Sequence, residues 1–390
     1  MPLLPTDAMM AAPAVTASAP LPPAQPRPAR TPTTTFIRIV APMTLLVLLL
    51  TWWLWTPDLD RATLEARYLR APGDLVDLAV AGPTRSATVT ATSTSTSPSA
   101  SASASSTSAV AVLQPVRLHV RDSGPRGAPA VVMLHGFGAS LHTWEAWAEV
   151  LQREHRVIRF DLPGSGLSPP DPSGIYTDAR SMQLLLALLD QLGVPKASVV
   201  GHSIGGRLAW QFAAAHPERI DKLVLLSPDG FASPGFEVGK APEVPASFKL
   251  MRWVLPRPLL EMSLAPAYAD PGRVLNEALT TRYFELMRAP GSRDALLDRM
   301  AQTVLVDPRP VLVRIQAPTL LLWGEQDQMI PIANAADYVQ AISGVTLLRL
   351  PGVGHLAQEE DNPAAPGVAL RAVAEFLRVS PPPSATPARP

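Results

Sequence analysis

Residues 197–215 read ASVVGHSIGGRLAWQFAAA, and this stretch decides the predicted fold. The small and β-branched residues 197–200 predict a buried strand, and the run that starts at residue 207 predicts a helix. Between them stands Gly-His-Ser-Ile-Gly, a pattern that lifts a serine hydroxyl out of a tight strand-to-helix turn. Glycine allows the strained backbone of such a turn, and the N–H groups at the helix start favour an anion. We therefore expect Ser203 to be a nucleophile.

A serine hydroxyl attacks only when a neighbouring base takes its proton. The chain has seven histidines, and His355 is the one in a loop, PGVGH, that follows the predicted strand 345–350. The carboxyl ends of parallel strands meet at one edge of a sheet, so this loop is expected beside Ser203. The other six fall in predicted strands, in or at the ends of helices, or in glycine turns. His355 is the expected general base.

An acid must orient that base, and in this layout it lies between the serine and the histidine in the chain. Asp327 follows the apolar run 319–323 and is the expected acid. Asp229, just past the run 223–226, is the alternative. Glu325 is expected to be solvated.

The charge that develops on an attacked carbonyl oxygen needs two prepared N–H donors. The residue after the nucleophile, Ile204, is expected to supply one. The second is expected from the turn HGFG at 135–138, which follows the apolar run 131–134. Phe137 N–H is the predicted donor, since the flanking glycines permit a close backbone approach.

Short apolar runs alternate with amphipathic helical windows from about residue 112 to 380. This alternation is typical of an α/β architecture with a mostly parallel, doubly wound sheet covered by helices. An earlier run, 75–80, is a candidate hairpin partner for the first strand, 116–120. This alternation of predicted strands and helices stops at residue 231 and resumes near 312. The pattern therefore predicts a helical insertion over 231–311.

Five motifs stand in the order and at the spacings of the α/β-hydrolase superfamily: HGFG, DLPGSGLS, GHSIGG, GEQD and GVGH. The chain resembles this superfamily over about 112–380, and we expect the hydrolase-like part to start near residue 72. The resemblance implies an α/β-hydrolase fold, a cap domain at 231–311 that roofs the active site, and neither a metal nor a cofactor. It also implies a catalytic triad and a pair of oxyanion donors, namely Ser203, Asp327 and His355 with Phe137 and Ile204.

The expected activity is hydrolysis of a carboxylic ester with a small or medium apolar acyl group, through an acyl-enzyme. The turn that holds the nucleophile, here called the elbow, carries a serine in this chain. This disfavours the similar haloalkane dehalogenases and epoxide hydrolases, which need an aspartate at that position. Carbon–carbon bond hydrolases of aromatic degradation share the layout, yet their elbow usually reads GNS where this chain has GHS. Lactonase, thioesterase and perhydrolase activities stay open, as does a non-enzymatic, membrane-tethered binding module on the same fold.

The net charge and the absence of cysteine restrict the classes of partner and of site. The 390 residues carry 33 basic and 33 acidic side chains, so the zero formal charge gives no support to a nucleic-acid partner. The chain has no cysteine, which excludes disulfides, thiolate metal sites and a thiol nucleophile.

The amino-acid composition changes along the region that precedes the hydrolase-like part. Residues 1–35 hold nine prolines and predict a disordered tail. Residues 36–55 carry one charge, Arg38, and end in a tryptophan cluster, which predicts a single membrane-spanning helix and a lipid bilayer as partner. A signal peptide and a core helix are the alternatives. The numbers of basic residues before and after this helix are equal, so they do not set its orientation. We expect the large domain on the non-cytoplasmic side.

Three further segments complete the predicted organisation. Residues 56–111 form a juxtamembrane segment, and within it 86–109 consist almost only of Ser, Thr and Ala. No packed core can form from that composition, so a flexible insert is expected. The proline-rich residues 381–390 predict a second disordered tail.

Overall fold

The computed structural model describes residues 32–81, 113–233, 237–360 and 367–378. The chain divides into two compact units, Met1–Trp53 and Leu54–Pro390. The expected insert 86–109, the tail 381–390 and most of the tail 1–35 lie outside the described residues.

The first unit contributes one helix to the described part, α1, which spans Pro32–Leu54 with Pro42 inside it. In the described part of the chain, no helix is long and apolar enough to cross a bilayer. The predicted membrane-spanning helix over 36–55, and the membrane location that follows from it, therefore have no support.

The second unit is built on one eight-stranded sheet with the order β1-β2-β4-β3-β5-β6-β7-β8. The pairs β1–β2 and β2–β4 are antiparallel, and the five remaining pairs are parallel. The predicted hairpin of the run 75–80 with the first strand is confirmed. The strands are β1 Leu75–Ala81, β2 Leu113–Ser123, β3 Ala130–Leu134, β4 Arg156–Phe160, β5 Ala197–His202, β6 Ile220–Leu226, β7 Thr319–Gly324 and β8 Thr346–Leu350.

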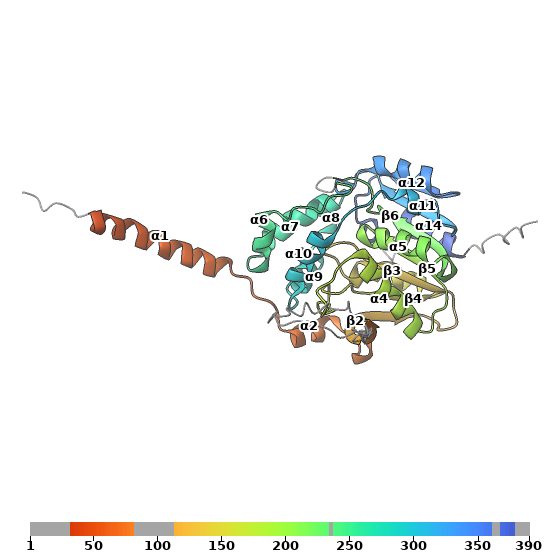
Figure 1. Ribbon diagram of the computed structural model, residues 1–390, viewed down its shortest axis with the longest axis horizontal. Coiled ribbons are helices and arrows are strands. Elements are labelled where there is room, and N and C mark those ends of the chain that lie inside the picture. Colours follow the sequence, from red (N-terminus) through yellow and green to blue (C-terminus); the bar gives the residue numbers. More distant parts are fainter. Residues whose placement is uncertain (1–31, 82–112, 234–236, 361–366, 379–390) are drawn as a thin grey trace, which may run out of the picture. The chain divides into compact units, whose positions relative to one another are not determined.

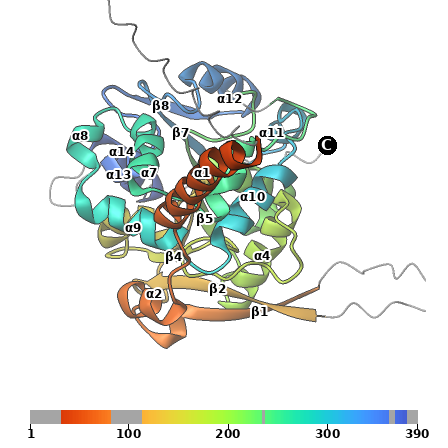
Figure 2. The same cartoon turned by 90° about the vertical axis from the view of Figure 1, so that its left-hand side faces the viewer.

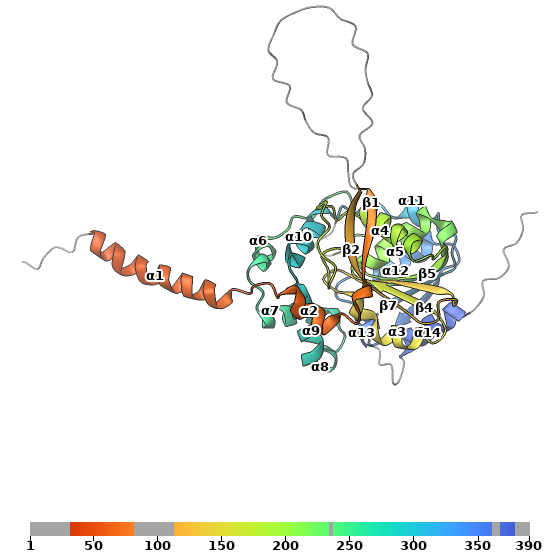
Figure 3. The ribbon, with the colours of Figure 1, turned by 90° about the horizontal axis from the view of Figure 1, so that it is seen from below.

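Helices cover both faces of the sheet, which confirms the α/β class and explains why the central strands read as continuous apolar runs. One face packs against the longer helices α4 and α5, and the other against α3 and α14 (Figure 3). The bounds are α3 Glu145–Leu151, α4 Asp178–Gln191, α5 Ile204–Ala215, α11 Arg309–Leu312, α12 Ala335–Ala341, α13 Ala357–Glu360 and α14 Val368–Arg378.

The chain between β6 and β7 carries several helices joined by loops, and we call the part from α6 to α10 the cap. Its helices gather on one side of the sheet (Figure 1). They are α6 Ala246–Lys249, α7 Arg257–Leu264, α8 Pro271–Val274, α9 Glu277–Met287 and α10 Ser292–Gln302.

A segment ahead of β1, residues 55–70, fastens the cap to the sheet. It contains α2, Arg61–Tyr68, which lies at the β1–β2 edge (Figure 2). Asp58 Oδ1 accepts a hydrogen bond from Arg293 at 2.6 Å, and Tyr68 donates to Glu285 at 2.8 Å. Leu64 is 1% exposed and packs with Leu167, Leu286 and Ala289. The compact unit thus begins at Leu54, well before residue 112, where the sequence pattern placed the start of the hydrolase-like part.

Asp161, at the end of β4, holds two loops at the carboxyl edge of the sheet. Its carboxylate accepts from the N–H of Leu141 at 2.6 Å and of Leu167 at 2.9 Å, and contacts His119 Nδ1 at 2.7 Å. Burial alone would raise the pKa of Asp161, but the His119 contact and the nearby imidazoles outweigh it and lower that pKa to about 2. Asp161 is therefore a loop-capping residue.

Shortening Leu64 to alanine tests whether the segment 55–70 belongs to the hydrolase unit. Leu64→Ala should lower the free energy of unfolding by about 2–4 kcal/mol, because it leaves a cavity between α2 and the cap. Urea unfolding measures this. The matched control is Leu259→Ala on α7, which is 53% exposed and should stay within about 0.5 kcal/mol of the wild type. Equal stabilities of the two variants would contradict the packing described.

Asp161→Asn tests the charge that holds the two loops. A carboxylate with a lowered native pKa stabilises the fold above its unfolded pKa, and this contribution is lost as the pH falls toward 2. The variant should therefore be less stable at pH 5, and its deficit should narrow by roughly 2 kcal/mol between pH 5 and pH 2. Urea unfolding at several pH values measures the gap. A deficit that does not change with pH would contradict the assignment.

Candidate active site

The turn between β5 and α5 places Ser203 in a strained conformation. Its φ is 54°, and in the described part only one other non-glycine residue, Ser227, has a positive φ. Glycines make the turn possible: a Cβ added to Gly201 would lie 2.3 Å from the Gly205 carbonyl oxygen, and one added to Gly205 would lie 2.3 Å from that of Leu134. Such backbone strain is typical of functional sites.

The expected base and acid are in contact. His355 Nδ1 lies 2.8 Å from Asp327 Oδ2, and the Asp327 side chain is fully buried. The other carboxylate oxygen, Oδ1, accepts from the N–H groups of Met329 and Ile330, both at 2.9 Å. A carboxylate held in this way keeps the proton of His355 on Nδ1, which leaves Nε2 free to act as a base.

Two loops bring His355 to the nucleophile turn. The N–H groups of His355 and Leu356 both donate to the cap carbonyl of Ala267, at 2.8 and 3.1 Å. On the other side the ring of His202, the residue before Ser203, lies 4.5 Å from the His355 ring, centroid to centroid. His355 thus contacts Asp327 on one side and the ring of the residue that precedes Ser203 on the other.

The two expected oxyanion donors lie beside the serine. Ile204 is the first residue of α5, where helix N–H groups lack an acceptor within the helix. Phe137 lies in the loop after β3, between Gly136 and Gly138. A Cβ added to Gly136 would lie 3.2 Å from Ser203 Cβ, so this loop runs directly against the nucleophile.

The alternative acid has another partner. Asp229 is 7% exposed, and its carboxylate forms an ion pair with Arg207 of α5. Burial raises the pKa of Asp229, and the Arg207 guanidinium opposes that rise. The Asp229 N–H donates to the Ser203 carbonyl at 3.0 Å, so this residue supports the turn from behind. Glu325 is exposed and pairs with Arg349 at 2.9 Å.

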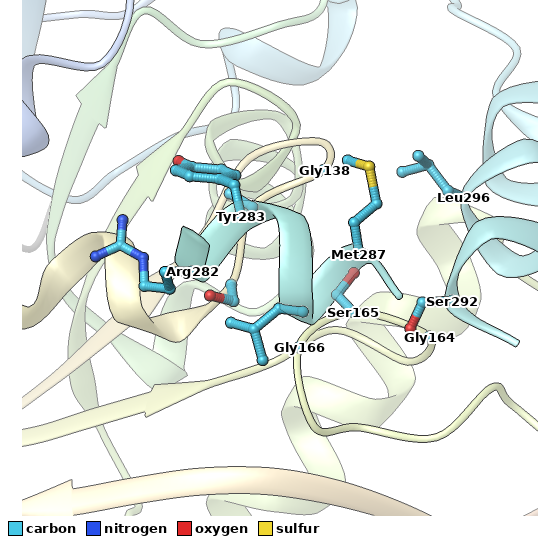
Figure 4. A pocket seen from close by; sticks show the side chains of 12 residues that line it. Gly138, Gly164, Ser165, Gly166, Arg282, Tyr283, Met287, Ser292 and Leu296 are labelled. Carbon is cyan, nitrogen blue, oxygen red and sulfur yellow. The ribbon is translucent and has the colours of Figure 1, made fainter. Parts of the chain in front are cut away.

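A small pocket, open to solvent, lies between the oxyanion loop and the cap (Figure 4). Arg282 and Tyr283 of α9 reach a buried carboxylate, Glu359 of α13: Arg282 forms an ion pair with it, and the Tyr283 hydroxyl donates to it at 3.0 Å. Tyr268 also donates to Glu359. The residues that line this pocket are Gly138, Ala139, Ser140, Gly164, Ser165, Gly166, Arg282, Tyr283, Leu286, Met287, Ser292 and Leu296.

Sequence patterns did not indicate the Arg282–Glu359 pair or the contact of His202 with His355. Both join segments far apart in the chain, and neither has a local motif of its own. The one available signal was the histidine inside the elbow. Within the described residues, no cluster of histidines and carboxylates could hold a metal ion.

Residues 129–362 match the model of the alpha/beta hydrolase fold family. A 2-hydroxy-6-oxononadienedioate/2-hydroxy-6-oxononatrienedioate hydrolase of Pseudomonas putida is 30% identical over 261 residues, covering 63% of this chain and 87% of that protein.

Solved structures give the same fold. The meta-cleavage product hydrolase of Pseudomonas fluorescens superposes with a TM-score of 0.58 at 22% identity, covering 67% of this chain and 94% of the other. The enol-lactonase of Burkholderia xenovorans superposes with a TM-score of 0.57 at 24% identity, covering 67% and 96%. With the family match over 129–362 and the sheet described above, this chain belongs to the alpha/beta hydrolase fold family and is a hydrolase by its relatives.

Proposed function

We propose that this chain hydrolyses a carbonyl substrate through an acyl-enzyme on Ser203, with His355 as the general base and Asp327 as the residue that orients it. The observation that carries the proposal is the 2.8 Å contact between His355 Nδ1 and Asp327 Oδ2 at the sheet edge that bears the strained serine. A base and an acid so arranged serve no purpose in a module that only binds, and we set the binding-module alternative aside on this ground.

The reaction follows from the roles of these groups. Ser203 Oγ attacks the carbonyl carbon while its proton passes to His355 Nε2. The N–H groups of Phe137 and Ile204 stabilise the negative oxygen that forms. The leaving group departs with the proton from His355, and a water molecule, activated by the same base, then releases the acid and restores Ser203.

The relatives support a carbon–carbon bond as the first candidate for the bond that is cleaved. The Pseudomonas putida relative is named for a 6-oxo dienedioate substrate. Attack at such a ketone expels a carbanion that is delocalised over the diene, which His355 can protonate. On this reading the chain acts on a vinylogous diketone formed during the breakdown of aromatic rings.

A specific contact favours a second candidate, a carboxylic ester or lactone with an uncharged acyl group. The substrate named for that relative is an anion, and a buried anion site needs an uncompensated cation. We infer that a substrate bound at Ser203 extends into the pocket beside the oxyanion loop. Of the described residues that line this pocket, Arg282 alone is cationic, and Glu359 already neutralises it. The GHS elbow, in place of the GNS common in carbon–carbon hydrolases, points the same way.

Turnover of two substrates by the full chain decides between these candidates. Loss of the absorbance of 2-hydroxy-6-oxo-6-phenylhexa-2,4-dienoate reports carbon–carbon hydrolysis, and release of p-nitrophenol from esters of graded acyl length reports ester hydrolysis. We expect at least one activity, abolished in Ser203→Ala, and the larger kcat/KM assigns the bond. Absence of both activities in a folded sample would contradict the proposal.

Paired substitutions test which carboxylate orients the base. Asp327→Asn should lower kcat by a factor on the order of 10⁴, because the His355 ring loses the partner that fixes its tautomer. Asp229→Asn should keep kcat within about tenfold, because its carboxylate pairs with Arg207, which retains Asp178 at 2.9 Å. Steady-state kinetics and circular dichroism of both variants supply the measurements. The reverse order of effects would assign the role to Asp229.

A further inference from the structure

His202 lies between the loop that carries the general base and the loop that carries an oxyanion donor. Its side chain is 2% exposed, and Nε2 lies 2.9 Å from the carbonyl oxygen of His355. The two rings are 4.5 Å apart and tilted by 58°. One imidazole therefore contacts both the backbone and the ring of the proposed base.

The opposite edge of the same ring faces the oxyanion loop. A Cβ added to Gly136 would lie 2.8 Å from His202 Nδ1 and 3.2 Å from Ser203 Cβ. The imidazole thus fills the space that a side chain at position 136 would need. Among the described residues, Nδ1 has no hydrogen-bond partner. A buried, unpaired nitrogen costs free energy, which argues for a role other than stability.

These contacts define the charge of the ring. A carbonyl oxygen only accepts hydrogen bonds, so Nε2 carries the proton and Nδ1 holds a lone pair. Burial lowers the pKa of His202 well below its usual value, and positive charge on His355 and His135 would lower it further. His202 therefore stays neutral when His355 takes the serine proton, while Asp327 balances the charge on His355.

The base is also held from the cap side. The N–H groups of His355 and Leu356 donate to Ala267, and the carbonyl of His355 accepts from His202. The peptide groups on both sides of His355 are thus fixed by different parts of the fold.

We propose that His202 is a positioning residue that sets the separation between the His355 ring, Ser203 and the oxyanion loop. The inference rests on the function proposed above, since it assigns His355 the role of base. The Nε2–H bond holds the loop that carries His355, and the His202 ring, tilted by 58° against the His355 ring, occupies the space on that side of the base. Misplacement of a catalytic group by about 1 Å is enough to cost about a hundredfold in rate.

Labelling of Ser203 by a fluorophosphonate tests the inference without knowledge of the substrate. His202→Phe keeps a flat ring but removes the N–H group, and His202→Gln keeps a donor within reach of the His355 carbonyl. The matched control is His216→Phe at the end of α5, where the histidine is 32% exposed. Labelling rates are measured from pH 5 to 9 at equal fractions of folded protein, with the unfolding temperature of each variant recorded.

We expect His202→Phe to label about 10- to 100-fold more slowly, His202→Gln to recover part of this loss, and His216→Phe to match the wild type. A lower unfolding temperature with an unchanged labelling rate at equal fractions of folded protein would reduce His202 to a structural residue and overturn the inference.

Failure of the inference and failure of the proposed function give different results. If the wild type labels rapidly and His202→Phe labels equally fast, the inference is wrong and the proposed function stands. If the folded wild type takes no label at all, the proposed function fails and the inference fails with it.

Discussion

The strained turn at Ser203 is the constraint on which the rest of the site depends. A φ of 54° at a residue with a side chain persists only where the surroundings fix it. Gly201 and Gly205 leave room for backbone of the turn and of β3, and the N–H of Asp229 holds the Ser203 carbonyl from behind. Once the turn is fixed, the sheet order brings the oxyanion loop to one side of the serine and the base loop to the other.

Sequence patterns predicted the fold, and they singled out the three residues of the proposed triad, because both rest on strong local signals. Strands buried on both faces read as apolar runs, and the Gly-x-Ser-x-Gly pattern occurs between a strand and a helix for a physical reason. His355 and Asp327 follow from the same logic, since each stands in a loop after a predicted strand. The predicted spanning helix over 36–55 rested on composition and flanking tryptophans alone, and the described helix α1 does not support it.

What the sequence could not predict are contacts between distant segments. The segment 55–70 packs on the cap through one buried leucine and a few polar contacts, whose partners lie more than two hundred residues away. The pair of Arg282 with Glu359 joins α9 to α13, and it neutralises the one cationic side chain among the described residues that line the pocket. Neither a periodicity nor a motif indicates such pairs, because each member alone is an ordinary charged residue in the sequence. The relatives and this pair favour different substrates for the same chemistry.

The central claim is that Ser203 is the nucleophile of this hydrolase. Intact-mass and peptide mass spectrometry after reaction with a fluorophosphonate tests it most directly. The account predicts one adduct per chain, located on the peptide that contains Ser203, and no adduct on the folded Ser203→Ala variant. An adduct on a different residue, or equal labelling of the two proteins, would contradict the account.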